Sequence, residues 1–168
     1  FLRWDDRGFL FDPGEGTQRQ MIRAGVSATD VTRMFVTHFH GDHCLGLAGM
    51  VQRFSLDDVR HPIPVHYPAS GQRYFDRLRH ASIFQERAEV VPSPIEGPGV
   101  IHRDAALSLR AVALDHRVEC FGYRLDEADG WTFRPDELEA RGVRGPDVGR
   151  LAQQGSVLVA GEQVRIDD

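Results

Sequence analysis

Residues 33–43 read RMFVTHFHGDH, and this stretch decides the fold of the chain. Its first part, residues 33–37, is short, apolar and β-branched, which is typical of a buried strand. Four potential metal ligands follow within six residues, namely His38, His40, Asp42 and His43. Imidazole and carboxylate groups at this density suit zinc or a similar first-row divalent ion. The sequence therefore predicts a metal site at the end of a buried strand.

The spacing of these ligands divides them into two sets. Residues two apart in an extended segment point the same way, so His38 and His40 are predicted to hold one ion together. Asp42 and His43 lie beyond the turn at Gly41 and are predicted to reach a second ion a few ångströms away, as in two-metal hydrolases.

A further histidine is expected to complete the first set. His116 follows an alternating strand predicted at residues 107–114, and we expect it to be the third ligand of the ion held by the first two histidines. Three histidines with an open position are typical of a catalytic site, because a metal-bound water there ionises near neutral pH. The isolated His61, His80 and His102 are expected to have structural roles.

Strands and helices alternate along the first 125 residues, which predicts a layered α/β domain. Apolar runs predict strands at 2–4, 9–11, 33–37, 63–66, 107–114 and 120–125, and helical patterns predict helices at 17–24, 45–54 and 72–80. From residue 126 the chain is polar and rich in Gly and Pro, with short helices predicted near 135 and 146 and a hairpin at 157–166. We expect a core at 1–125, an excursion at 126–155 and a return to the core at 156–168.

Length and composition exclude several classes of protein. A chain of 168 residues with 41% hydrophobic and 27% charged residues is ordinary for one globular domain and unlike a disordered or collagen-like chain. The net charge is −5 and every basic residue is Arg, so binding of nucleic acid requires a local Arg cluster or a metal. The two cysteines, Cys44 and Cys120, are expected to be reduced thiols of a cytosolic protein.

The motif at 38–43 resembles the signature of the metallo-β-lactamase superfamily. More narrowly, FDPGEGTQRQ at 11–20 together with THFHGDH at 37–43 resembles the ribonuclease Z family. LDHRV at 114–118 and FGYR at 121–124 resemble that family's third metal motif and the strand after it. The resemblance implies a metallo-β-lactamase-like αββα sandwich with an inserted arm. We expect the sandwich to be partial here, without the family's opening strand and its C-terminal part.

The resemblance also implies a role for each candidate residue. His38, His40 and His116 would hold the first zinc, and Asp42 and His43 the second. Asp42 would in addition accept a proton from the attacking water. Asp12 would support the metal loop from behind the ligands. The excursion at 126–155 corresponds to the flexible arm that grips tRNA, and the arm residues expected to contact it are Arg141, Arg144, Gly145, Pro146 and Arg150.

The function implied by the resemblance is that of a zinc-dependent endoribonuclease. Such an enzyme removes the 3′ trailer from tRNA precursors by metal-activated hydroxide attack on a phosphodiester and leaves a 3′-hydroxyl on the tRNA. Two zinc ions per complete subunit and a homodimer are implied as well. From the composition and the two cysteines we further expect a cytoplasmic location and no association with membranes. Two alternatives stay open: a same-fold metallo-hydrolase of small phosphodiesters or other esters, and a non-catalytic RNA-binding remnant.

The chain departs from the family pattern in its number of metal ligands. The family completes its two-zinc site with a bridging Asp and a further His, both downstream of the arm, and no histidine follows His116 in this sequence. We therefore expect this chain to be an internal fragment of a longer enzyme. We also expect it to bind the first zinc incompletely and the second poorly, and to be inactive by itself.

Overall fold

The apolar runs at the start of the chain form the main sheet of a computed structural model that describes residues 1–128 and 132–167. The strand order is β1-β2-β3-β4-β5. β1 and β2 form an antiparallel hairpin, and the other neighbours pair in parallel. The strands are β1 (Leu2–Trp4), β2 (Arg7–Phe11), β3 (Arg33–Phe35), β4 (Ile63–Pro68) and β5 (Val90–Ile95). Since parallel strands end at the same edge of a sheet, the segments after β2, β3 and β4 meet at one edge.

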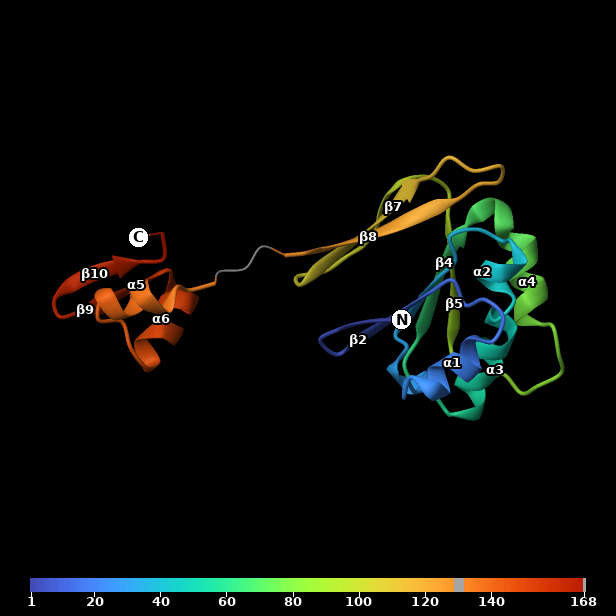
Figure 1. The fold of residues 1–168 in the computed structure, drawn as a ribbon, viewed down its shortest axis with the longest axis horizontal. Coiled ribbons are helices and arrows are strands. Elements are labelled where there is room, and N and C mark those ends of the chain that lie inside the picture. The colour runs from blue at the N-terminus through green and yellow to red at the C-terminus, as the bar shows by residue number, and fades with distance from the viewer. Residues whose placement is uncertain (129–131, 168) are drawn as a thin grey trace. The chain divides into compact units, whose positions relative to one another are not determined.

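Helices cover one face of this sheet (Figure 1). The helical elements are α1 (Thr17–Arg23), η1 (Ala28–Asp30), α2 (Gly41–Cys44), α3 (Leu47–Leu56), η2 (Ala69–Gly71) and α4 (Gln72–Arg79). In α3, Leu47, Met50, Val51 and Phe54 are buried, at the spacing of one helical face. They pack with apolar side chains of the sheet into the larger core of the molecule.

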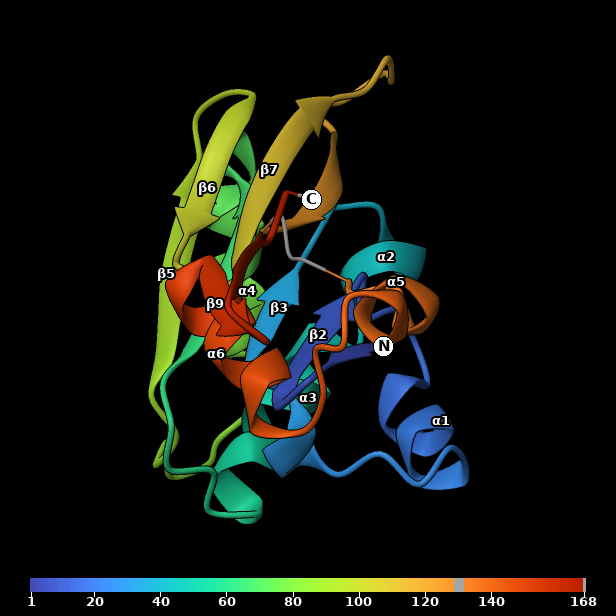
Figure 2. The same ribbon diagram turned by 90° about the vertical axis from the view of Figure 1, so that its left-hand side faces the viewer.

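A second, antiparallel sheet covers the other face of the main sheet. It consists of β6 (Gly99–Arg103), β7 (Leu107–Ala113) and β8 (Phe121–Glu127) in that order, and Figure 2 shows β6 and β7 side by side. Leu107 and Leu109 alternate inward and pack against Phe9 and Phe35 of the main sheet. Helices, main sheet and second sheet are three consecutive layers of the α/β sandwich predicted from the sequence, and the α/β fold is confirmed.

Two strands, the short helix α2 and the 3₁₀ helices η1 and η2 were not predicted. β5 contains Pro92 and Pro94, which argue against a strand because proline has no N–H to donate. The structure places β5 at the edge of the sheet, where one side of the strand needs no partner. β6 was missed as well, and residues 41–44, expected in a loop, form the short helix α2.

The chain divides into two units, Phe1–Glu127 and Ala128–Asp168. The second unit contains α5 (Pro135–Ala140), α6 (Pro146–Gln154) and the hairpin of β9 (Ser156–Val159) and β10 (Glu162–Arg165). Its own core joins Val157 and Val164 of the hairpin to Val143 and Leu151.

Residues 156–167 belong to the second unit, and the buried valines of β9 and β10 pack against α6. The return to the core that these apolar strands suggested stays a prediction. The boundary lies after Glu127, two residues beyond the expected one. Residues 129–131 of the expected arm, and Asp168 at the end of the chain, lie outside the described residues. In the described part, no helix is long and apolar enough to cross a membrane.

Candidate metal centre

Asp12 ties the ends of β2 and β3 together. Its backbone N–H donates to the Phe35 carbonyl at 2.8 Å. Its carboxylate accepts the Thr37 N–H at 2.7 Å through Oδ1 and the Thr37 hydroxyl at 2.9 Å through Oδ2. Asp12 has a φ of 45°, a left-handed conformation that Asp tolerates better than most residues. The expected supporting role of Asp12 therefore has a geometric basis, since it holds the residue that precedes the first histidine.

Thr37 passes this support on to His38. Because the Thr37 hydroxyl gives its proton to Asp12, its oxygen accepts a hydrogen bond from Nδ1–H of His38 at 2.9 Å. This bond leaves Nε2 of His38 unprotonated, with its lone pair free for a metal. Burial lowers the pKa of His38, and the neighbouring imidazoles lower it further. The neutral imidazole, which is the form that binds metal, is thereby favoured.

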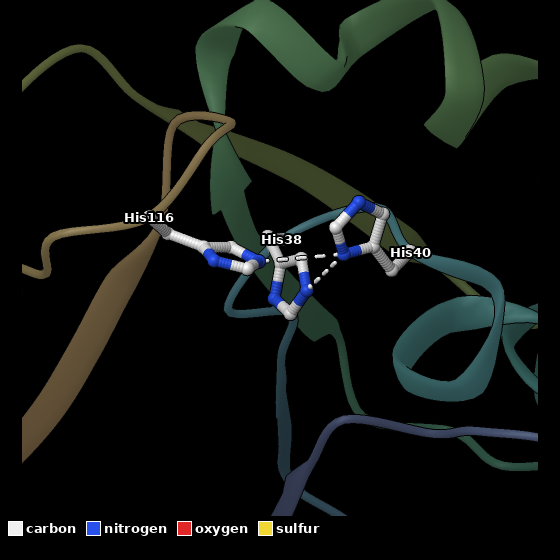
Figure 3. Close-up of side chains that lie close together, drawn as sticks. All are labelled: His38, His40 and His116. Atoms are coloured by element: carbon white, nitrogen blue, oxygen red, sulfur yellow. Dashed lines mark hydrogen bonds between the residues drawn. The ribbon is translucent and has the colours of Figure 1, made fainter.

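Three histidines, His38, His40 and His116, converge just beyond β3 (Figure 3). Nε2 of His38 lies 2.9 Å from Nδ1 of His40, and Nε2 of His116 lies 3.3 Å from the same atom. All three ligand atoms lie within 4.8 Å of one another. Zinc–nitrogen bonds of about 2.0–2.1 Å in a tetrahedral site separate the nitrogens by about 3.3 Å. The donor set and its spacing therefore fit a zinc-sized ion.

The second sheet delivers His116 to this cluster. The N–H of Phe121, at the start of β8, donates to the Thr37 carbonyl at 3.0 Å, and the N–H of Leu114 donates to the Cys120 carbonyl at 3.0 Å. These bonds close the connection between β7 and β8 and hold it beside the end of β3. The structure thus brings His116 next to two residues almost 80 positions earlier in the chain.

Asp42 and His43 lie on α2, beside the three histidines. Nδ1 of His43 donates to Oδ2 of Asp12 at 2.8 Å, and Nε2 of the same ring lies 3.5 Å from Oδ2 of Asp42. The His38 and His43 rings are 4.2 Å apart between centroids. In the described part of the chain, only the three-histidine cluster brings three ligand groups together. Asp42 and His43 form a pair of potential ligands next to it.

The two cysteines and the three isolated histidines lie outside the three-histidine cluster and have other contacts. Cys44 and Cys120 are buried and free, and burial raises the pKa of both thiols. Sγ of Cys120 lies 3.8 Å from Nδ1 of His38, a contact that the sequence did not reveal. His61 and His80 bond to backbone carbonyls, and His102 bonds to a carboxylate.

The predicted arm residues gather around the start of α6 in the second unit. Gly145 has a φ of 54° and precedes the helix, and Pro146 is its first residue. Arg144 pairs with Glu139 at 3.4 Å and Arg150 with Asp147 at 3.0 Å. Arg141 caps α5 and lines a hollow of about 280 Å³.

Comparison with known proteins gives consistent matches. The family described as the metallo-beta-lactamase superfamily matches residues 1–148. A ribonuclease Z of Nocardia farcinica is 57% identical over 166 residues, which is 98% of this chain and 54% of that protein. A ribonuclease Z of Chlamydia trachomatis is 46% identical over 99% of this chain and 55% of that protein. The chain thus spans about half the length of the curated relatives it matches.

Solved structures agree with these sequence matches. The short form of human tRNase Z superposes with a TM-score of 0.67 at 28% identity, over 75% of this chain and 55% of that one. A diphosphatase of the PhnP family superposes with a TM-score of 0.60 at 20% identity, over 83% of this chain and 54% of that one. The second likeness concerns the fold alone.

Proposed function

The chain belongs to the metallo-beta-lactamase superfamily, and from this membership we propose that it serves in a zinc-dependent endoribonuclease that removes the 3′ trailer from tRNA precursors. The observation that carries the proposal is the convergence of His38, His40 and His116 at the end of β3. The names of the relatives, ribonuclease Z and tRNase Z, support the substrate class.

In this proposal each group of the centre has one task. The three histidines hold the first zinc, and Asp42 and His43 contribute to a second. When bound, zinc makes water acidic and offsets the negative charge that develops on the phosphate. The Asp42 carboxylate is 81% exposed and lies beside His43, so it is placed to accept the proton of an attacking water. Asp12 and Thr37 hold the first ligand in its metal-binding tautomer.

The second unit is proposed to hold the tRNA away from the cut. Arg144 and Arg150 are 73% and 62% exposed, and each pairs with an acidic neighbour. Exposed ion pairs of this kind contribute at most about 1 kcal/mol, so RNA phosphates can displace the carboxylates at low cost. Local Arg residues thus allow a chain of net charge −5 to bind RNA. The homodimer, the cytoplasmic location and the stoichiometry of two zinc ions stay predictions from the sequence.

Cleavage of a labelled tRNA precursor by the whole protein tests this proposal. We expect one cut at the end of the tRNA body, a 3′-hydroxyl on the tRNA product, and loss of cleavage with a zinc chelator. His116→Ala should abolish the cut, while His102→Ala, which removes a histidine outside the cluster, should retain it. Cleavage that survives both the chelator and His116→Ala would contradict the proposal.

Replacing the second unit separates the proposal from its two alternatives. With residues 128–168 exchanged for a short Gly-Ser linker, the proposed nuclease should lose tRNA affinity and still hydrolyse a small chromogenic phosphodiester. If the intact protein hydrolyses the small diester and leaves precursor tRNA uncut, it is a small-molecule hydrolase. If it binds tRNA regardless of chelators and cuts neither substrate, it is a non-catalytic RNA-binding protein.

A further inference from the structure

A groove of about 560 Å³ opens beside the three-histidine cluster. His40 belongs to both, so whatever fills the groove lies next to the metal ligands. The walls come from the segment after β3, from η2 and α4, and from the connection between β7 and β8. A space of this size is sufficient for one nucleotide or a similar small group. None of the roles proposed above uses this groove.

Aromatic rings form one wall of the groove. The Phe39 ring lies against that of Tyr74, with ring centroids 5.8 Å apart and planes inclined by 30°. It also meets the buried Tyr67 edge to face at 5.8 Å. A Cβ at Gly71 would overlap the Phe39 ring, so the ring can pack here only because residue 71 is a glycine. The wall is therefore a packed surface, and Tyr74 as a residue remains 37% exposed.

The guanidinium group of Arg73 packs against this wall. The Arg73 guanidinium lies 4.6 Å from the centre of the Tyr74 ring, and its Nη2 donates to the Tyr74 hydroxyl at 2.6 Å. Within residues 1–128 and 132–167 the structure gives Arg73 no carboxylate partner, in contrast to Arg79 of the same helix, which pairs with Glu86. The charge of Arg73 is thus available to an anion in the groove.

The lining of the groove also contains one acid, Glu119. Oε2 of Glu119 accepts the backbone N–H of Ser70 at 3.3 Å, and Val118 lies beside it. A carboxylate there repels a phosphate but accepts hydrogen bonds from the amino group of a base. The groove is therefore lined by aromatic rings, a cation and a hydrogen-bond acceptor, which fits a molecule with one anionic and one aromatic part.

From this arrangement we infer that the groove binds one unpaired RNA nucleotide next to the scissile phosphate, with its base against the Phe39–Tyr74 wall and its phosphate at Arg73. This inference rests on the proposed function. Aromatic rings that stack bases and arginines that contact the backbone are the usual means of holding single-stranded nucleic acid. Tyr74 and Arg73 thus position the strand, and the groove selects an unpaired nucleotide because a paired base cannot leave its helix without cost.

Equilibrium binding of a short RNA tests the groove. The probe is a fluorescein-labelled pentaribonucleotide, and its partner carries an abasic ribose at the central position. Because stacking on an aromatic ring stabilises a bound base, we expect the whole protein to bind the intact probe about tenfold more tightly. Tyr74→Leu should bring the two affinities within twofold, and Tyr74→Phe should restore the difference.

Arg73→Gln and Arg77→Gln form a matched pair for the phosphate contact. Both residues are exposed on α4, but only Arg73 lines the groove. Arg73→Gln should weaken binding of both probes about fivefold and lower the slope of log affinity against log salt by about 1, whereas Arg77→Gln should change neither. Equal binding of intact and abasic probes by the unaltered protein, or equal effects of the two substitutions, would overturn the inference.

These measurements remain separable from the test of the proposed function. If the binding pattern is found and precursor tRNA is not cut, the groove stands and the nuclease proposal fails. If the precursor is cut but the expected differences in probe binding are absent, the nuclease proposal stands and the inference about the groove fails. Precursors with an abasic site at the last tRNA nucleotide or at the first trailer nucleotide then identify the occupant. For each precursor, the loss of cleavage caused by the abasic site is measured in the unaltered protein and in Tyr74→Leu. The nucleotide that occupies the groove is the one whose removal slows cleavage only in the unaltered protein. If both abasic precursors are slowed equally in both proteins, the groove does not hold either nucleotide.

Discussion

Thr37→Val is the substitution that tests how the first zinc ligand is held. Valine keeps the β-branched shape of threonine, so the packing at the end of β3 is preserved. It removes the hydroxyl that donates to Asp12 and accepts from His38, both at 2.9 Å. Asp12 retains the backbone N–H of residue 37 and the bond from His43, so the loop stays in place. Nδ1 of His38, however, loses its oxygen acceptor and keeps only the weak contact with Sγ of Cys120 at 3.8 Å, so the metal-binding tautomer is selected much less strongly.

The magnitude follows from the two lost bonds. A hydrogen bond to a carboxylate contributes about 1.5–3 kcal/mol and a neutral one about 0.5–1.5 kcal/mol, and the site is partly open to solvent. We expect the free energy of unfolding of the metal-free chain to fall by about 1–3 kcal/mol. Loss of a partner that orients a metal ligand lowers metal affinity by about 10- to 100-fold. The zinc dissociation constant of Thr37→Val should rise by this factor.

Competition with a chromogenic chelator at pH 7.5 measures the zinc affinity, and urea unfolding measures the stability. Thr32→Val is a matched control, because the Thr32 hydroxyl also makes two bonds, both to the backbone of Gly8 at 3.1 and 3.2 Å. The control should lose stability and keep its zinc affinity within twofold. If Thr37→Val keeps its zinc affinity within twofold, or if both variants lose it equally, the proposed support of His38 is refuted.

Three further predictions follow from other parts of the structure. Burial and a neighbouring arginine lower the pKa of His66 from 6.5 to about 3. The unfolded chain therefore binds the additional proton as the pH falls below about 6.5, and this histidine costs about 1.4 kcal/mol of stability per pH unit between pH 6 and 4. His66→Gln should remove that slope in urea titrations, and an unchanged slope would show that the histidine is protonated in the folded state. Gly71→Ala should lower the free energy of unfolding by about 1–3 kcal/mol because the new methyl overlaps Phe39. Gly97→Ala, which has open space around it, should stay within about 0.5 kcal/mol, and equal losses would remove the steric argument. Asp42→Asn should lower kcat for precursor tRNA cleavage by about 10²- to 10⁴-fold, while a chelator titration finds first-site zinc affinity within threefold. A rate near that of the unaltered protein would exclude Asp42 as the proton acceptor.

The parts of the centre that are local in sequence could be predicted from the sequence. His38 and His40 follow a buried strand at a spacing of two, and alternation alone places them on one side. The approach of His116 depends on bonds between the two sheets, which no local pattern contains. It was predicted because a histidine at a strand end was combined with a resemblance to a known family.

The remaining features depend on tertiary context. Thr37 reads as an ordinary strand residue, and its bridge between Asp12 and His38 emerges only when β2 and β3 lie side by side. β5 was missed because its prolines fit a strand only at the edge of a sheet. The hairpin of β9 and β10 was predicted correctly as local structure, but its packing against α6 was not. The apolar pattern of a strand shows that one of its faces is buried, but not which other element buries it.

Zinc X-ray absorption of the purified chain tests the central claim most directly, since it reports the ligands themselves. The account predicts a bound zinc with imidazole nitrogens at about 2.0–2.1 Å and no sulfur ligand, and it predicts that His116→Ala lowers the nitrogen count. A zinc–sulfur distance of about 2.3 Å would mean that a cysteine holds the ion. That result, or a spectrum unchanged by His116→Ala, would contradict the three-histidine centre.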